Sequence, residues 1–261
     1  MQVGQLEVLP VFDGLGHEAA RDVLRRPGAA GDPWARHAGQ LGPGGQLEFA
    51  LGGFLVRSAG RVLLVDTGVG TIDNGQYRGG QFLASLRAHG VEPADVTDVL
   101  FTLLHFDHVG WATQQGTVVF PNAVHRVHEA DWAWFVTRPE AVPGGVRKLS
   151  PLAGHVETFA GECAIAPGVT ARPVPGHTPG STVFELASGG QRALLLGDVV
   201  HSVVELLEPG WEFAFDTDRA AAAAVRERIS AELRQTGDPA AAAHFPGLAF
   251  GRFAGGEWVF L

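Results

Sequence analysis

The chain has 261 residues, enough for one large domain that buries roughly three quarters of its unfolded surface. Its 28 acidic and 19 basic residues give a net charge of -9, and no cluster of Lys and Arg stands ready to displace counterions from a nucleic acid. The single cysteine, Cys163, cannot form an internal disulfide. These numbers exclude a disulfide scaffold and disfavour a nucleic-acid partner.

The apolar runs of the chain are short. None approaches the roughly 20 residues that span a bilayer, and the opening residues MQVGQLEVLP lack the basic start and apolar core of a signal peptide. We therefore expect a soluble, cytoplasmic protein with no membrane partner. The 36 glycines and 16 prolines favour many short elements joined by turns.

The first half of the chain is expected to consist of strands and one helix. Apolar runs bounded by turn residues predict the strands, and the spacing of Phe82, Leu83 and Leu86 predicts the helix. The expected strands cover residues 5–12, 49–57, 61–65 and 96–102, and the expected helix covers residues 81–89.

A long segment without periodicity separates the first two strands. Residues 27–45 are rich in Gly, Pro and Ala and contain Trp34. Loops of this length in a compact domain are usually functional covers or disordered links. We predict that residues 13–46 form a loop over a site and that Trp34 contacts a substrate there.

The second half continues the alternation of strands and helices. In the longest expected helix, Val225, Ile229 and Leu233 recur every four residues, Asp216 or Thr217 serves as the N-cap, and Gly237 supplies the stop. Such alternation predicts layered sheets covered by helices in a single domain, residues 1–261. The strands are expected at 124–127, 170–174, 181–186 and 193–196, and the helices at 129–135 and 218–235.

The densest polar cluster lies directly after an expected buried strand. His105, Asp107 and His108 occur in the stretch FTLLHFDHVG. Imidazole and carboxylate together suit a borderline metal such as zinc, although two His and one Asp also occur in solvated loops. Because the surrounding residues are apolar, unpaired polar groups here would be costly to bury, and coordination would compensate that cost.

Three later segments repeat the pattern of an apolar strand, a small-residue turn and a metal-binding side chain. They are VPGHTPGS with His177, LLLGDVV with Asp198 and AAAHFPG with His244. Alone, a His in a turn or an Asp after Gly is a weak signal. In this order and together they are a strong one.

With these motifs in place, the chain resembles the metallo-β-lactamase-fold hydrolase superfamily, and most closely its N-acyl homoserine lactonase-like branch. The superfamily pattern is HxHxDH, then a His in a GHTPG-like turn, an Asp in GD and a late His. The resemblance runs from LLVDTG at residues 63–68 to His244. It implies an α/β fold, an αββα four-layer sandwich of two mixed sheets flanked by helices, with the site at one edge between the sheets.

The resemblance also implies roles for individual residues. Two metal sites share one carboxylate, and Asp66 in LLVDTG supports the metal loop without binding metal. Asp107 would in addition act catalytically by carrying a proton to the leaving group. The implied ligands are His105 and His177 for one ion, Asp107, His108 and His244 for the other, and Asp198 for both.

One position departs from the superfamily pattern. Where HxHxDH begins, this chain has Leu103, and a leucine side chain cannot coordinate a metal. A catalytic zinc site usually has three protein ligands. We expect the second site to fill readily and the first to be weak, partly occupied or empty, with reduced activity as the result.

The resulting functional hypothesis is a metal-dependent hydrolase of a small neutral or apolar ester, most closely a lactone. The cofactor is expected to be one or two Zn2+ ions, with iron or manganese as alternatives. Alternative functions within the same fold are a thioesterase and an organophosphate hydrolase. A further alternative is an inactive or altered scaffold that binds a small molecule. A homodimer is one option for the assembly.

Aromatic residues near the ligand motifs suggest an apolar substrate pocket. The only tyrosine, Tyr77, lies in a Gly-rich stretch and is interpreted as an ordinary loop residue. The expected substrate-binding residues are Trp34, Trp111, His201 and Phe213.

Overall fold

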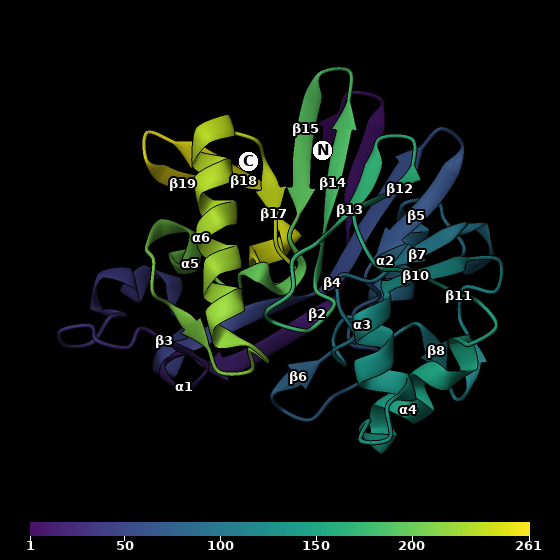
Figure 1. The fold of residues 1–261 in the computed structure, drawn as a ribbon, viewed down its shortest axis with the longest axis horizontal. Helices are drawn as coiled ribbons and strands as arrows, with labels where there is room; N and C mark the ends of the chain where they lie inside the picture. The colour runs from purple at the N-terminus through teal and green to yellow at the C-terminus, as the bar shows by residue number, and fades with distance from the viewer.

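The computed structural model describes residues 1–261, which form two β-sheets packed face to face with helices on both outer sides (Figure 1). The expected four-layer αββα sandwich is therefore confirmed. The strand order of the first sheet is β1 (Gln2–Val3), β2 (Leu6–Ala19), β4 (Gln46–Ser58), β5 (Arg61–Val65), β7 (Asp98–Leu100), β10 (Val124–His128) and β11 (Val156–Phe159). A further short strand, β6 (Tyr77–Arg78), pairs with β2.

The second sheet is built by the later part of the chain and mixes parallel and antiparallel pairs. Its one parallel pair joins β15 to β17, and the others are antiparallel. Its order is β12 (Cys163–Ala166), β13 (Val169–Pro173), β14 (Thr182–Ser188), β15 (Gln191–Leu195), β17 (Ala240–Ala241), β18 (Gly251–Ala254) and β19 (Glu257–Phe260).

Helices cover the outer faces, and short strand pairs lie at the periphery. The helices are α1 (Ala20–Val23), α2 (Phe82–Ala88), α3 (Glu129–Trp132), α4 (Pro143–Leu149), α5 (Val204–Leu207) and α6 (Arg219–Thr236). The small pairs are β3 (Leu24–Arg25) with β16 (Glu212–Phe213) and β8 (Thr113–Gln114) with β9 (Thr117–Val118).

The alternation of side chains along the central strands explains the layers. In β4, Phe54 and Val56 belong to the core between the sheets, whereas Leu55 packs outward in the cluster that contains Phe82 of α2. In α6, Ile229 lies in a third cluster against the outer face of the second sheet. Strands with both faces buried read as continuous apolar runs, and for this reason the central strands were visible in the sequence.

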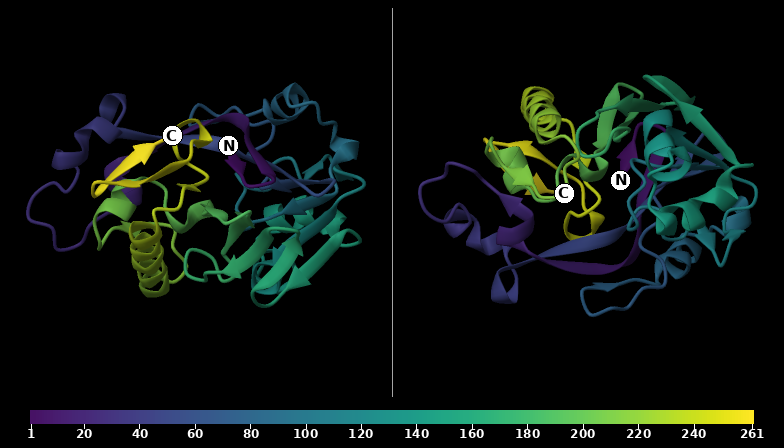
Figure 2. Two further views of the ribbon diagram at one scale, coloured as in Figure 1. Left: turned by 90° about the horizontal axis from the view of Figure 1, so that it is seen from above. Right: turned by 60° about the horizontal axis from the view of Figure 1, so that its bottom comes forward.

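Strand β2 is longer than expected. It pairs with β4 from Glu7 opposite Arg57 to Ala19 opposite Gln46, with a bulge at Asp13. The prediction that residues 13–46 form a loop is therefore wrong for residues 13–25, which belong to β2, α1 and β3. Residues 26–45 consist of turns and 3-10 segments, Ala35–Gln40 and Pro43–Gly45, and extend outward beyond the end of these strands (Figure 2).

Helix α6 agrees with its expected range, but its N-cap differs. The side chain of Asp218 accepts a hydrogen bond from the Ala221 N–H, and the helix ends at Gly237 with φ of 68°. The predicted cap at Asp216 or Thr217 is wrong because the buried Asp216 carboxylate faces His177 and Arg226 instead.

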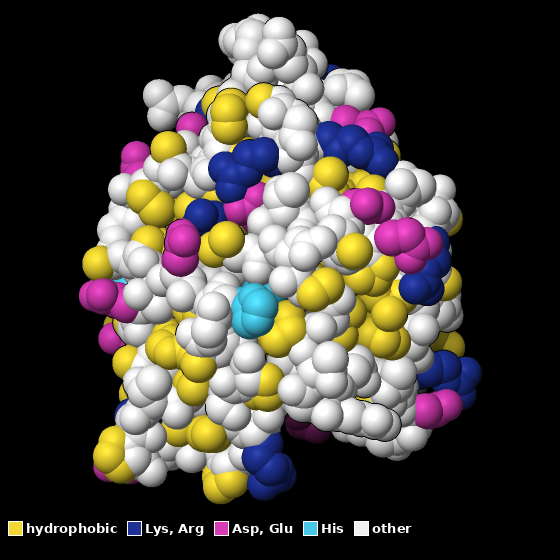
Figure 3. All heavy atoms as spheres, turned by 90° about the vertical axis from the view of Figure 1, so that its right-hand side faces the viewer, with side chains coloured by type: hydrophobic (Ala, Val, Ile, Leu, Met, Phe, Trp, Pro, Cys, Tyr) yellow, Lys and Arg dark blue, Asp and Glu magenta, His cyan; other side chains and the backbone are white.

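None of the helices combines the length and the apolar character that a membrane crossing requires. Figure 3 shows a face on which basic and acidic side chains are interspersed among apolar ones.

Candidate metal centre

The four motif segments meet at one edge of the sandwich, each at the end of a strand. The first follows β7 of the first sheet and supplies His105, Asp107 and His108. The others follow β13, β15 and β17 of the second sheet and supply His177, Asp198 and His244. The centre is thus assembled from both sheets.

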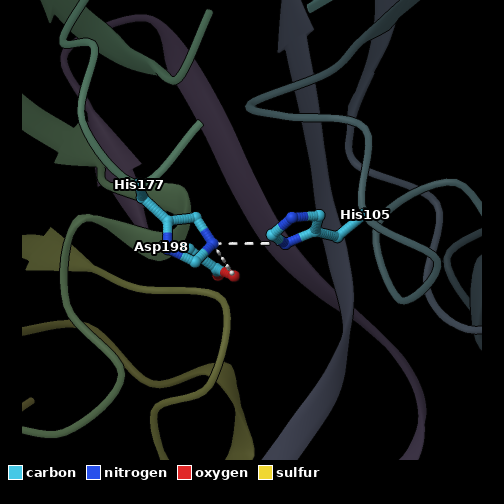
Figure 4. A group of neighbouring side chains, drawn as sticks. All are labelled: His105, His177 and Asp198. Carbon is cyan, nitrogen blue, oxygen red and sulfur yellow. Dashed lines mark hydrogen bonds and ion pairs between the residues drawn. The ribbon is translucent and has the colours of Figure 1, made fainter. Parts of the chain in front are cut away.

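One group of side chains comprises His105, His177 and Asp198. The Nε2 atom of His177 lies 3.2 Å from Nδ1 of His105 and 3.4 Å from Oδ2 of Asp198. In Figure 4 the two imidazoles point toward each other across the edge, with the carboxylate beside them.

A second group comprises Asp107, His108 and His244. The Nε2 atoms of His108 and His244 each lie 3.2 Å from Oδ1 of Asp198, and Oδ2 of Asp107 lies 3.6 Å from His244 Nε2. One oxygen of Asp198 therefore faces each group, which is the geometry of a bridging carboxylate.

The donor set fits divalent cations. Every group offers imidazole nitrogen and carboxylate oxygen, the donors that zinc and other borderline metals accept. His108 Nε2 and Asp198 Oδ1 are buried and have no hydrogen-bond partner. Buried polar atoms without partners are rare, and a shared cation would satisfy both.

The imidazoles of three motif residues are oriented by acceptors on their other ring nitrogen. Nδ1 of His108 lies 2.9 Å from Asp66 Oδ2, and Nδ1 of His177 lies 3.0 Å from Asp216 Oδ1. Nδ1 of His244 lies 3.1 Å from the Ala50 carbonyl oxygen. This arrangement places Nδ1–H toward the acceptor and leaves Nε2 free to bind a metal.

Asp66 takes part through an unusual backbone conformation. Its φ is 61°, and its carboxylate accepts hydrogen bonds from the N–H and the hydroxyl of Thr102 at 2.8 and 2.6 Å. Strained backbone of this kind persists where the surroundings hold it in place. Asp66 thereby connects the ends of β5 and β7 to His108.

Burial and neighbouring charges set the protonation of the centre. Burial and the adjacent His177 lower the pKa of His105 to about 3, so its lone pair is free. Burial opposes ionisation of Asp198, yet His108 and His244 hold the pKa of this carboxyl well below its usual range. Burial likewise disfavours charge on His108, but the carboxylates of Asp198 and Asp66 raise its pKa. Asp198 is therefore an anion before any cation arrives.

A cavity of about 420 Å³ opens onto both groups. Aromatic rings form much of its wall, and no Lys or Arg lines it. Its lining comprises Glu18, Phe49, Gln76, Tyr77, His105, Phe106, Asp107, Asp198, His201, Phe213, Phe215 and His244.

The four expected substrate-binding residues fall into two classes. His201 and Phe213 line the cavity and stack on each other. Trp34 is fully buried against Trp211 and donates its indole N–H to the Leu24 carbonyl. Trp111 is buried and donates to Asp13. Neither tryptophan lines the cavity, so their assignment to substrate binding is wrong for this structure.

Several residues that line the cavity or support the structure around it were not identified from the sequence. Tyr77 was interpreted as a loop residue, but it lies in β6, lines the cavity and donates to Glu18. Phe106 lies between two expected ligands in the sequence, and this position could have indicated that it lines the site. Asp13 shows no local signal, because its five hydrogen bonds go to groups far along the chain: Val69, Gly70, Gly80, Phe82 and Trp111.

No curated protein sequence matches the chain at a significant level. The structure of AidC, a dizinc quorum-quenching lactonase in complex with a product, N-hexanoyl-L-homoserine, is similar. Its TM-score is 0.86 at 25% identity, and the match covers 100% of this chain and 95% of that one. The hydrolase AbOPH gives a TM-score of 0.85 and 24% identity over the same shares of both chains.

A third similar structure is a probable metal-dependent hydrolase from Staphylococcus aureus, with a TM-score of 0.83 and 21% identity, covering 100% of this chain and 99% of that one. The family model of the metallo-beta-lactamase superfamily matches residues 53–244, which include all the motif residues described above. The chain therefore belongs to the metallo-β-lactamase superfamily and is a metallo-hydrolase of that fold.

Proposed function

We propose that the chain hydrolyses the ring ester of a small neutral lactone with an apolar side chain, of the N-acyl homoserine lactone type. The observation that carries this proposal is the lining of the cavity, which joins aromatic rings to two ligand groups without a single Lys or Arg. A cationic side chain would be expected for a phosphate-rich or carboxylate-rich substrate. The structurally similar AidC is a dizinc quorum-quenching lactonase in complex with a product, N-hexanoyl-L-homoserine.

The cavity lining offers both apolar and polar contacts for such a substrate. The rings of Phe106 and Phe215 are solvent-exposed and line the cavity, so they provide apolar surface for an acyl chain. Glu18 and Tyr77 form a hydrogen-bonded pair at the same cavity, so the carboxylate can accept a hydrogen bond from the amide N–H of the substrate. Burial raises the pKa of Tyr77, so its hydroxyl stays a neutral donor.

Bound divalent cations would supply Lewis acidity for the ester carbonyl and lower the pKa of a coordinated water. Zinc is the proposed cation, with iron and manganese as alternatives for the same donors. Asp107 lines the cavity beside His244 and is placed to carry a proton to the leaving alcohol at its carboxylate. His108, His177 and His244 hold their positions through the acceptors described above.

A substrate panel tests the proposal. The zinc-loaded protein is given lactones with acyl chains of different length, an aryl ester, a thioester and a neutral phosphotriester, and ring-opened or cleaved products are measured by chromatography. We expect the highest kcat/KM for a lactone and its loss with a chelator. Turnover of another class alone, or binding without turnover, would replace the lactonase proposal.

The matched variants are Asp107→Asn and Asp22→Asn. Both remove one carboxylate, but Asp22 is exposed and lies outside the cavity lining. We expect a decrease of 100-fold or more in kcat for Asp107→Asn, in the range of a lost general acid. Asp22→Asn should leave kcat unchanged.

A further inference from the structure

The first ligand group lacks one histidine. Leu103 is buried and apolar at the position where the superfamily pattern begins, so that group retains His105, His177 and one oxygen of Asp198. Because Asp198 also faces the second group through its other oxygen, the first site has only two nitrogen donors of its own. This deficit raises the question of what else reaches the same place.

His201 lies beside the carboxylate of Asp198 in the first ligand group. Its Nε2 is 3.5 Å from Asp198 Oδ2, the same oxygen that lies 3.4 Å from His177 Nε2. Zinc–nitrogen and zinc–oxygen bonds of about 2.0 to 2.2 Å in a tetrahedral site separate two ligand atoms by about 3.3 to 3.6 Å. His201 and His177 therefore flank this carboxylate oxygen at the spacing of ligands to one ion.

The ring nitrogens of His201 have no hydrogen-bond partner. Its side chain is almost fully buried, and neither ring nitrogen makes a hydrogen bond. An unpaired buried imidazole is costly, whereas a cation bound at Nε2 would compensate the cost. Nδ1 lies 3.8 Å from Glu205 Oε2, so the tautomer with Nδ1–H toward this carboxylate leaves the Nε2 lone pair free.

The surroundings hold the ring in place. The Phe213 ring stacks on it with centroids 3.4 Å apart, and Glu205 Oε2 accepts hydrogen bonds from the main-chain N–H groups of His201 and Ser202 at 2.6 and 3.0 Å. The turn between β15 and α5 thus presents Asp198 and His201, three residues apart, to the same point. A substrate could reach only the small exposed part of this ring.

We infer that His201 Nε2 is a ligand of the first cation site and replaces the donor that Leu103 cannot provide. This inference rests on the metal centre of the proposed function, but it does not depend on which ester is hydrolysed. It differs from the expectation that the first site is weak or empty, and it assigns His201 to metal binding rather than to substrate contact.

The experiment counts Zn2+ ions in four proteins: wild type, His201→Asn, Leu103→His, and the double variant. Each is dialysed against buffered Zn2+, its metal content is measured by mass spectrometry, and its affinities are measured by competition with a chromophoric chelator. We expect two ions in the wild type, and at least a 10-fold weaker second ion in His201→Asn. Leu103→His should restore the second ion to the double variant, because it returns a nitrogen donor to the same site.

His125→Asn is the matched control. His125 is likewise buried with both ring nitrogens unpaired, but it lies in β10 away from both ligand groups. We expect it to keep two ions. If His201→Asn does not fold, His201→Phe keeps a ring against Phe213 and removes only the donor.

Three results would overturn the inference. They are a single ion in the wild type, unchanged zinc affinity in the His201 variants, or a loss in those variants that Leu103→His does not rescue. Because the readout is ion binding, a protein that binds two ions and opens no lactone would contradict the proposed function and leave this inference standing.

Discussion

Nδ1 of His177 lies 3.0 Å from Oδ1 of Asp216, and the other carboxylate oxygen accepts a hydrogen bond from Arg226 at 2.6 Å. The buried carboxylate thus fixes both the tautomer and the direction of the His177 ring. Burial opposes its ionisation, but the hydrogen bond with His177 and the guanidinium of Arg226 lower the pKa of Asp216 to about 2. Asp216 is therefore an anion at neutral pH.

Replacing this carboxylate should weaken metal binding. We expect Asp216→Asn to reduce zinc affinity 10- to 100-fold, the range for loss of a partner that orients a ligand. The measurement is competition with a chromophoric chelator. Asp218→Asn is the control, because it changes the same residue type two positions away at an exposed helix cap that Asn also serves. Equal affinities for both variants would show that Asp216 does not orient His177.

Metal removal should lower thermal stability. A ligand that binds only the folded state at 100 times its Kd stabilises that state by about 2.7 kcal/mol. For a domain of this size we expect the apparent Tm to rise by about 5 to 10 °C when Zn2+ is added to chelator-treated protein. The Tm is followed by circular dichroism. Ca2+ prefers all-oxygen sites and should give no comparable shift; an equal shift with Ca2+ would argue against a nitrogen-rich centre.

Asp131 should make the stability of the metal-free protein depend on pH. Burial raises the pKa of Asp131 to about 6, although the N–H of Gly180 and the hydroxyl of Thr178 donate to it. Because the folded pKa exceeds that of the unfolded chain, the contribution of this group is fully present below pH 4. It decreases as pH rises through 6. Two pKa units correspond to about 3 kcal/mol.

The comparison for this prediction is Asp131→Asn, which cannot titrate and retains a carbonyl oxygen for the Gly180 N–H. Urea denaturation at pH 4, 5, 6 and 7 should show wild type losing about 3 kcal/mol relative to the variant. Parallel pH profiles for the two proteins would contradict the assigned pKa.

Phe215 should affect long-chain substrates selectively. Its side chain is 60% exposed yet lines the cavity, so truncation removes contact surface with little change in the core. With about 1 kcal/mol of lost apolar contact, we expect Phe215→Ala to raise KM about 5-fold for a decanoyl lactone and to leave a butanoyl lactone unaffected. Val259→Ala, an exposed apolar change at β19, is the control. Equal KM changes for both chain lengths would place the acyl chain elsewhere.

The central strands and the ligand motifs could be predicted because their signals are local. Residues of β4 and β5 form apolar runs, and His105, Asp107 and His108 lie within four positions of one another. Helix α6 was visible through the four-residue recurrence that includes Ile229. Such patterns depend on the burial of one face, which the sequence records directly.

The remaining features depend on contacts between distant segments. Nothing near Asp13 indicates that it accepts a hydrogen bond from Trp111, 98 residues away, and that bond removes Trp111 from the cavity. The continuation of β2 to Ala19 follows from its pairing with β4 rather than from its own alternation. Trp34 likewise became a core residue through Trp211, whose position no local pattern predicts.

Asp198 joins the two halves of the molecule as well as the two ligand groups. His105 and His108 extend from the first sheet, whereas His177, Asp198 and His244 extend from the second. A cation bound between these residues would link the two sheets at one edge of the sandwich, whereas the rest of the interface between the sheets is held by apolar packing. In the metal-free protein, amide hydrogens at this edge should exchange with solvent faster than those in the buried parts of β4 and β14. The two sheets would then separate first at the edge that carries the metal centre.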